Sequence, residues 1–262
     1  MQPALWISKT GLDAQQTDIS VISNNVANAS TVGFKKSRAV FEDLLYQSVN
    51  QAGGVSAANT KLPNGLDIGA GTKVVATQKL FTQGNMLTTD NSLDMMIEGP
   101  GFFEIQMPDG TAAYTRNGQF TLDDSGQMVT SGSGYLVMPG ITIPDDATSI
   151  TVSAEGEVSV KSPGTAESQV VGQLTMSDFI NPSGLQPKGQ NLYIETGASG
   201  TPIQGTASLD GMGAVRQGAL ETSNVNVTEE LVNLIESQRI YEMNSKVISA
   251  VDQMLSYVNQ QL

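Results

Sequence analysis

The sequence predicts an α+β protein in which long N- and C-terminal helices pair as a coiled coil, with a central antiparallel β domain between them in the chain. Two observations predict this class. Apolar residues recur every seven positions near both ends of the 262-residue chain. Between the ends, apolar and polar residues alternate, and Gly, Pro, Asp and Asn interrupt the alternation at short intervals.

The N-terminal helix is expected to be amphipathic and roughly 25 residues long. It should end near residues 24–28, because asparagine side chains compete for backbone hydrogen bonds and the next segment favours a turn. We assign residues 1–30 to this element. Its apolar stripe consists of Leu5, Leu12, Ile19, Ile22 and Val26.

The C-terminal helix is expected over residues 225–262, and Asn226 followed by Glu229 resembles a capping box at its start. A strict seven-residue repeat implies a left-handed supercoil with a partner helix, and one such helix alone would fray. We therefore expect neighbouring copies to hold the helix pair; an ordinary helical hairpin on a single globule is the alternative. The apolar column and its flanks are Val227, Leu231, Leu234, Tyr241, Ile248, Val251, Leu255, Val258 and Leu262.

Residues 31–72 fit neither periodicity and are expected to form an extended connector that lies against another part of the protein, since a long free loop is uncommon. The basic run at residues 35–38 is expected to be a solvated turn, with acidic groups of a neighbouring molecule as the alternative contact. We expect residues 40–71 to wedge between neighbouring copies and stiffen the assembly. The characteristic connector residues are Phe41, Glu42, Asp43, Leu44, Leu45 and Tyr46.

The central β domain is assigned to residues 73–224. Turn residues at 108–110, at 124–126 and at Asn117-Gly118 predict tight hairpins. The apolar residues of 150–152 should pair with those of 158–160 across a short turn. Several short strands at such spacing predict an antiparallel sandwich or barrel.

The composition excludes several classes of function. The chain has 26 acidic and 13 basic residues, and this charge of −13 is unsuited to holding nucleic acid. It contains no Cys and no His, which removes thiol nucleophiles, imidazole bases and Cys/His zinc sites. Residues 90–215 hold 15 acidic and three basic residues, so the nearly neutral ends are the parts suited to packing many copies together.

The search for catalytic chemistry finds only weak candidates. Adjacent carboxylates at residues 123–124 and 145–146 lie in predicted turns, where Asp is favoured for backbone reasons. A carbohydrate-cleaving or carbohydrate-binding β protein, and a monomeric surface adhesin, stay open as alternatives. We expect no enzyme activity, no cofactor, no metal and no membrane insertion, and we find no secretory signal.

Three segments carry a family resemblance: residues 23–35, residues 101–120, and residues 221–227 with 238–242. Together they resemble the bacterial flagellar rod and hook proteins, over nearly the whole chain. The length and the connector most resemble the distal rod branch of this family, and the proximal rod is the nearest alternative. The motif residues are Asn24, Asn25, Asn28, Gly33, Phe34, Gly101, Phe102, Phe103, Arg116, Asn117 and Gly118.

The resemblance implies a structural subunit of the flagellar basal body that polymerises into a rigid hollow tube and supports motility. The paired helices would form the inner tube around the export channel, and the tube would transmit torque to the hook. The implied partners are further copies of the chain, the proximal rod proteins, the hook protein, the surrounding L and P rings and the flagellar type III export apparatus. The implied location is the periplasm, reached without a cleaved signal peptide.

Overall fold

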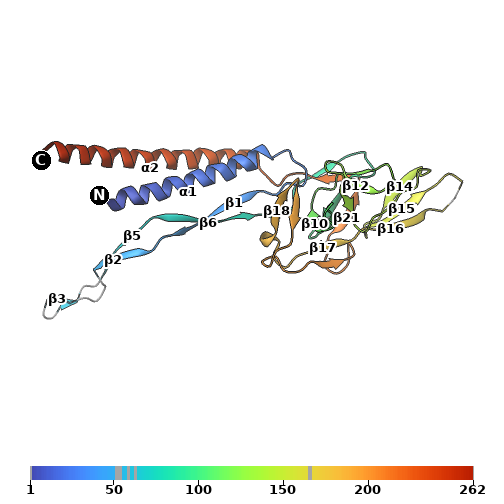
Figure 1. Cartoon of the computed structure of the whole chain (residues 1–262), viewed down its shortest axis with the longest axis horizontal. Helices are drawn as coiled ribbons and strands as arrows, with labels where there is room; N and C mark the ends of the chain where they lie inside the picture. The colour runs from blue at the N-terminus through green and yellow to red at the C-terminus, as the bar shows by residue number, and fades with distance from the viewer. Residues whose placement is uncertain (1, 51–54, 58–59, 62–63, 165–166, 262) are drawn as a thin grey trace. The chain divides into compact units, whose positions relative to one another are not determined.

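The computed structural model describes residues 2–50, 55–57, 60–61, 64–164 and 167–261, and it confirms the α+β class (Figure 1). The chain divides into two compact units. Unit 1 comprises Met1–Ala27, Ser37–Lys79 and Asn226–Leu262, and unit 2 comprises Asn28–Lys36 and Leu80–Val225. Residues 51–54, 58–59 and 62–63 of the predicted connector, and Leu262 of the predicted C-terminal column, lie outside the described residues.

Unit 1 contains the two helices, α1 (Gln2–Ala27) and α2 (Val227–Gln261). They pack side by side in antiparallel directions, with both chain termini at the same end of the pair (Figure 1). The predicted start of α2 is confirmed, because the Asn226 side chain caps the helix by accepting a hydrogen bond from the Thr228 backbone amide at 3.1 Å.

A two-stranded ribbon completes unit 1 and packs on α1. Residues 73–79, which the sequence assigned to the β domain, lie in its strand β6 and pair with β1. Gly71 has φ +115°, and a Cβ there would overlap the Thr10 hydroxyl, so glycine permits the close approach to α1. The antiparallel pairs are β1 (Ser37–Asp43) with β6 (Thr72–Lys79), β2 (Tyr46–Asn50) with β5 (Leu66–Gly69), and β3 (Val55–Ala57) with β4 (Thr60–Lys61).

Unit 2 is built on one large antiparallel sheet with the strand order β11-β12-β13-β9-β10-β19-β18, to which β17 adds beside β9 and β20 beside β17. The strands are β9 (Phe102–Gln106), β10 (Ala112–Thr115), β11 (Phe120–Leu122), β12 (Met128–Thr130), β13 (Leu136–Val137), β17 (Met176–Asp178), β18 (Gln186–Gly189), β19 (Leu192–Ile194) and β20 (Ile203–Gly205).

Three smaller antiparallel sheets and a short 3₁₀ helix, η1 (Pro182–Gly184), complete unit 2. The smaller sheets are β14 (Ser149–Val152) with β15 (Glu157–Lys161) and β16 (Gln169–Gln173), β8 (Met95–Glu98) with β21 (Ala214–Gln217), and β7 (Met86–Thr88) with β22 (Ala219–Glu221).

Two of the three predicted hairpin turns are confirmed, and so is the pairing of residues 150–152 with residues 158–160. The third, at Asn117-Gly118, is wrong, because β10 and β11 do not pair with each other. The Met95 amide donates to the Gly118 carbonyl at 3.0 Å, and a Cβ at Gly118 would overlap the Met95 carbonyl oxygen. Glycine serves there as a point of close backbone approach.

The core of unit 2 is aromatic as well as aliphatic. Phe103 and Phe120 meet edge to face at 5.2 Å, and both are fully buried. A second cluster surrounds Phe102, with Tyr114 and Phe179 in edge-to-face contact at 4.8 Å. Such pairs add about 0.5–1.5 kcal/mol each beyond the burial of their surface.

Tyr114 makes the stability of unit 2 depend on pH. Burial raises the pKa of Tyr114 to about 12, and the carboxylates of Glu104 and Glu195 add to the rise. The unfolded chain ionises near the ordinary value of 10.0. The stability contributed by the neutral phenol is therefore fully present below about pH 10 and is lost as the pH rises to about 12.

The Tyr114→Phe variant should consequently lose less stability at alkaline pH than the unsubstituted chain. Denaturant unfolding of unit 2 at neutral and alkaline pH measures the difference. Tyr46→Phe is the matched control, because the Tyr46 ring is 62% exposed. An alkaline loss of the same size in all three proteins would contradict the assignment.

Candidate functional site

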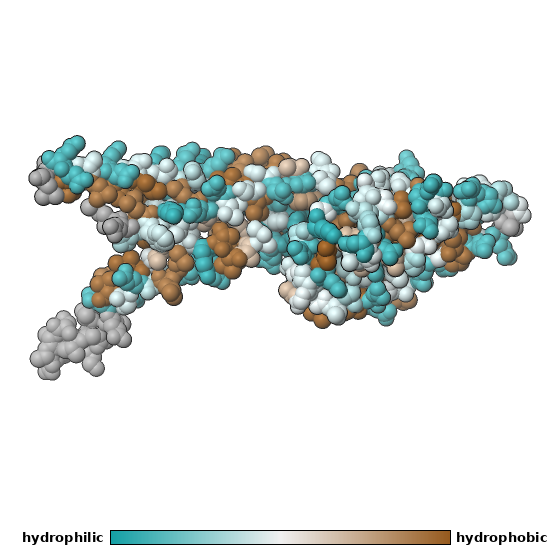
Figure 2. Space-filling view, viewed as in Figure 1, coloured by the Kyte–Doolittle hydropathy of each residue, from teal (hydrophilic) through white to brown (hydrophobic). Residues whose placement is uncertain are grey.

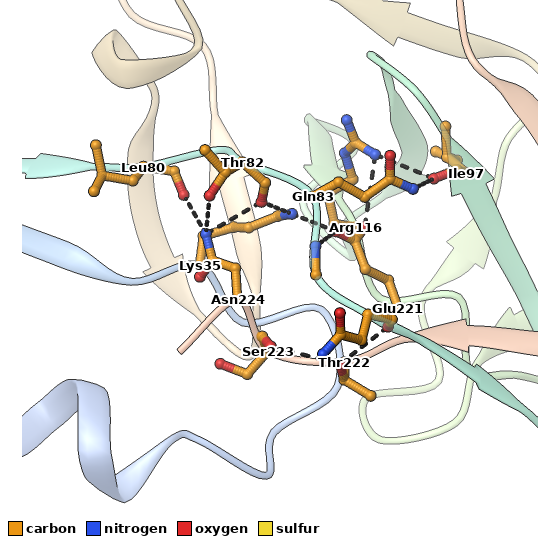
Figure 3. A network of polar contacts seen from close by, with 12 residues as sticks. Lys35, Leu80, Thr82, Gln83, Ile97, Arg116, Glu221, Thr222, Ser223 and Asn224 are labelled. Carbon is orange, nitrogen blue, oxygen red and sulfur yellow. Dashed lines mark hydrogen bonds and ion pairs between the residues drawn. The ribbon is translucent and has the colours of Figure 1, made fainter. Parts of the chain in front are cut away.

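Parts of the three segments that carry the family resemblance come together within unit 2, which contains their residues 28–35, 101–120 and 221–225 (Figure 3). The Gly33 amide donates to the Glu221 carbonyl at 2.8 Å, which joins the first segment to the third. Gly33 has φ +71°, and a Cβ there would lie 2.7 Å from the Asn117 amide nitrogen of the central segment. Only glycine fits between the two other segments at this point.

An ion cluster lies buried at this junction. The Lys35 ammonium donates to Glu221 Oε1 at 2.5 Å, and Arg116 Nη1 lies 3.6 Å from Glu221 Oε2. All three side chains are at most 5% exposed. Lys35 also donates to the Thr82 carbonyl at 2.9 Å, and the Gly84 amide donates to Glu221 Oε1 at 2.8 Å. The Glu221 carboxylate thus contacts two cations and one backbone amide.

The electrostatics of the cluster follow from its burial. Burial lowers the pKa of Lys35, and the facing carboxylate of Glu221 opposes that effect. Burial likewise lowers the pKa of Arg116, against the same carboxylate. Taking one member away would leave a buried charge without its partner, which is far more costly than losing a surface ion pair.

Arg116 connects this cluster to the aromatic core. Its guanidinium carbon lies 5.2 Å from the centroid of the Phe102 ring, and its Nη2 donates to the Gly99 carbonyl at 2.8 Å. Gly101 precedes that ring with φ +122°. The central motif residues therefore act by positioning the arginine over an aromatic face.

Asn224 closes the junction on its other side. Its Oδ1 accepts from the Lys36 amide at 2.7 Å, and its Nδ2 donates to the Leu80 carbonyl at 2.9 Å. The Leu80 amide donates to the Lys36 carbonyl at 2.9 Å, and the Asn224 side chain bonds the other backbone group of each residue. The sequence placed Asn224 and Glu221 in the third motif segment but gave no signal of their contacts, because the partners described here lie more than 100 residues away.

The expectation of a solvated turn at residues 35–38 is wrong for Lys35. This residue is 0% exposed and pairs with Glu221, 186 residues along the chain. The neighbouring Arg38 is exposed and donates to Gln78 Oε1 at 2.9 Å. Local sequence carries no signal for a pair of such separation.

The helix pair of unit 1 has a polar seam as well as an apolar one. Asn25 Nδ2 donates to Glu230 Oε2 at 3.1 Å and to the Ser37 carbonyl at 2.8 Å. One heptad earlier on α1, Asp18 Oδ2 accepts from the Ser237 hydroxyl at 2.7 Å. The sequence analysis missed this seam, although its members also recur every seven residues.

The predicted polymerisation residues occupy several faces of the helices. Ile22 and Val251 are buried, and the exposed members lie on α2. The half-buried members are Leu5, Leu12, Ile19, Val26, Leu234, Ile248 and Leu255, and the exposed members are Val227, Leu231, Tyr241 and Val258.

Large apolar side chains are exposed mainly on unit 1 (Figure 2). Among the described residues, 19 of them lie in unit 1 and seven in unit 2, although unit 1 is the shorter. Besides the predicted positions, α2 exposes Val232, Ile235 and Met243, at 51–58%. Exposure of many large apolar side chains is typical of surfaces that interact with other molecules.

The ribbon contributes to the same apolar surface. Leu45 is 90% exposed and Tyr46 is 62% exposed, whereas Leu44 is half-buried. The Glu42 carboxylate pairs with Lys73 at 3.2 Å across β1 and β6. A cavity of about 390 Å³ lies between the ribbon and the first turns of α1, and it is lined by Pro3, Trp6, Ile7, Gln47, Ile68, Gly69 and Ala70.

The adjacent carboxylates at residues 123–124 and 145–146, which were the catalytic candidates, form no buried cluster like that of Lys35, Arg116 and Glu221. Asp123 Oδ1 accepts from the Ser125 and Gln127 amides at 2.9 and 2.8 Å, as expected of a turn aspartate. In the described part of the chain no three His, Cys, Asp or Glu side chains gather as metal ligands. Neither described helix is long and apolar enough to cross a membrane.

Three stretches of the chain match known protein families. Residues 6–35 match the family described as Flagella basal body rod protein. Residues 96–160 match the Flagellar hook protein FlgE/F/G D1 domain, and residues 216–261 match the Flagellar basal body rod FlgEFG protein C-terminal domain.

Full-length relatives agree with these matches. The chain is 55% identical over 260 residues to the flagellar basal-body rod protein FlgG of Buchnera aphidicola subsp. Schizaphis graminum, covering 99% of this chain and 100% of that protein. FlgG of Borreliella burgdorferi is 49% identical over 261 residues, and FlgG of Bacillus subtilis is 40% identical over 262 residues. The first of these two matches covers 99% of this chain and 98% of the relative, and the second covers 97% of each.

The chain belongs to the family of flagellar basal-body rod proteins. This confirms the resemblance that the three sequence segments carry. As a rod protein, the chain is a structural component of the flagellar basal body.

The buried ion cluster predicts a large cost for losing Lys35. Lys35→Met should destabilise unit 2 by about 3 kcal/mol, because Glu221 loses its main partner in a buried site. Lys188→Met is the matched control, since Lys188 lies 3.7 Å from Asp109 and both side chains are about half exposed. Its cost should stay below about 1 kcal/mol. Chemical denaturation measures both values, and equal costs would show that the cluster is unimportant for stability.

Proposed function

We propose that the chain is a subunit of the distal part of the flagellar rod, and that it self-assembles into a rigid hollow tube. The exposed apolar surface of unit 1 carries this proposal, because a single copy leaves that surface in water. The tube would transmit torque from the motor to the hook and would enclose the channel through which later subunits are exported.

In this proposal α1 and α2 act as a coiled coil in the inner wall of the tube. Two antiparallel helices with seven-residue columns have a fixed crossing geometry, and this gives a stack of copies a defined pitch. The repeated contact joins different surfaces of successive copies, so the assembly grows as a filament instead of closing.

The proposed location is the periplasm, and the proposed partners follow from a position in the distal rod, between the proximal rod and the hook. They are further copies of the chain, the proximal rod proteins on one side, the hook protein on the other, and the L and P ring proteins around the tube. The subunit would leave the cytoplasm unfolded through the flagellar type III export apparatus. A chain without cysteine forms no disulfide that could obstruct this passage.

A place in the proximal rod is the nearest alternative, and a carbohydrate-active β protein is the alternative of a different class. A carbohydrate-cleaving enzyme requires a catalytic carboxylate, so Asp124→Asn would abolish turnover if the chain were such an enzyme. The same change would leave rod assembly intact, because the Asp124 side chain lies at an exposed turn.

Assembly should depend on the half-buried residues of α2. Leu234→Asp or Ile248→Asp should raise the concentration needed for polymerisation at least about tenfold, equivalent to about 1.4 kcal/mol, because each buries a charge in a helix contact. Sedimentation measures the polymer, and the thermal melting of unit 2 should be unchanged.

Glu242→Asp is the control for these variants, because it changes an exposed side chain of α2 that is already charged. Intact rods and normal swimming in cells that carry Leu234→Asp would count against the proposal.

The ribbon should stiffen the tube. The Leu44 amide donates to the Gly71 carbonyl at 2.8 Å, so residues 45–70 can be replaced by an Asn-Gly turn that leaves β1 and β6 paired. We expect this shortened chain to form bendable filaments, because the wedge between neighbours is gone. Negative-stain electron microscopy measures the curvature, and straight filaments would refute the role of the ribbon.

A further inference from the structure

The interface between α1 and α2 contains one column of polar and small residues. On α1 the column consists of Ala4, Gly11, Asp18 and Asn25, and on α2 it consists of Glu230, Ser237, Asn244 and Val251. Moving seven residues toward the C-terminus along α1 corresponds to moving seven residues toward the N-terminus along α2, as expected of antiparallel helices. The matched pairs that the structure describes are Asn25 with Glu230, Asp18 with Ser237, and Gly11 with Asn244.

The Asn25–Glu230 pair is buried, and the other two pairs are partly buried. Asn25, Glu230 and Ser237 are each at most 5% exposed. Asn25 is held on two sides, since its Nδ2 donates to Glu230 and to the Ser37 carbonyl while its Oδ1 accepts from the Ser37 amide at 2.9 Å. At Gly11 a Cβ would lie 2.9 Å from Asn244 Nδ2, so the missing side chain makes room for the amide.

The apolar columns cannot define this alignment by themselves. Leu5, Leu12 and Ile19 on one helix and Leu234, Tyr241 and Ile248 on the other all repeat every seven residues. A shift of seven residues therefore again sets an apolar position of one helix against an apolar position of the other. Helix α2 has 35 residues and α1 has 26, so α2 is long enough to accept such a shift.

We propose that the polar column fixes the register of the antiparallel helix pair, with Asn25–Glu230 and Asp18–Ser237 as the determining layers. A shift in one direction brings the Asp18 carboxylate opposite the Glu230 carboxylate, which repel. A shift in the other direction moves Glu230 past Asn25, so that these two side chains no longer form their hydrogen bond. The first error places two carboxylates together in the interface, and the second separates Glu230 from its amide donor. A single buried polar layer is an established way to specify register in paired helices.

The consequence for assembly rests on the proposed function. In a tube, every α1 is surrounded by many identical helices, and apolar columns alone would allow shifted pairs between or within copies. Polar layers that match in only one alignment reject those pairs. Subunits with a single register stack with a single rise, which a long straight rod requires.

The chain contains no cysteine, so engineered cysteine pairs report the register without background. Gly11→Cys with Asn244→Cys reports the observed register, because the Cβ of residue 11 lies 3.4 Å from Asn244 Cγ, within disulfide reach. Gly11→Cys with Val251→Cys reports a shift of seven residues. Both pairs are made in the full chain and oxidised mildly, and intrachain cross-links are read in the soluble and the sedimented fractions.

The test variant carries both Glu230→Leu and Ser237→Leu, which remove the α2 residues of the two polar layers. Asp18 then lacks its partner in the observed register but meets Asn244 in the shifted one. We expect the ratio of cross-linking at residue 251 to cross-linking at residue 244 to rise at least about tenfold over the unsubstituted background. Gln15→Leu is the matched control: among the described residues Gln15 Oε1 is buried without a hydrogen-bond partner, so replacing it should leave the ratio unchanged.

Each outcome decides the proposal. A raised ratio with an unchanged Gln15→Leu control supports it. Cross-linking that stays at residue 244, or that disappears at both positions, overturns it, because the layers would then be dispensable or needed only for pairing. Absence of the 11–244 cross-link from both fractions of the otherwise unsubstituted chain would instead count against the helix pair and so against the proposed tube.

Discussion

The terminal helices carry apolar side chains on more of their surface than one helix pair and one ribbon can cover. Ile22 and Val251 are buried within unit 1, but Leu231, Ile235 and Met254 of α2 remain about half exposed. Exposed leucine and isoleucine in this number favour association, because covering them removes apolar surface from water. Contact with other protein would cover that surface, which agrees with the chain's membership of the rod protein family.

Unit 2 is stabilised in a different way, through contacts between segments that are far apart in the chain. Lys35, Arg116 and Glu221 form one buried cluster, and each belongs to a different segment of the family resemblance. Such a cluster gives little net stability compared with apolar packing, but it penalises any arrangement in which one member is missing. In this chain the three motif segments contribute to one buried junction of unit 2.

The features repeated at short range in the sequence were predictable. The seven-residue columns predicted both helices, and Asn226 marked the start of α2. The alternation and turn residues around residues 108–110 predicted a true hairpin. Features that depend on distant partners were not predictable: Asn117-Gly118 looked like a hairpin turn because its real constraint is the backbone of Met95. Lys35 looked solvated for the same reason, since Glu221 is 186 residues away.

We propose that α1 and α2 become stable only when many copies surround them. Hydrogen exchange tests this dependence directly. Amide protection of α1, α2 and the strands of unit 2 would be compared in dilute soluble protein and in sedimented polymer. We expect rapid exchange in both helices of the dilute protein and strong protection of the same amides in the polymer. Unit 2 should be protected in the dilute protein and in the polymer. Helices that are fully protected in a dilute monomer, with no change on raising the concentration, would contradict it.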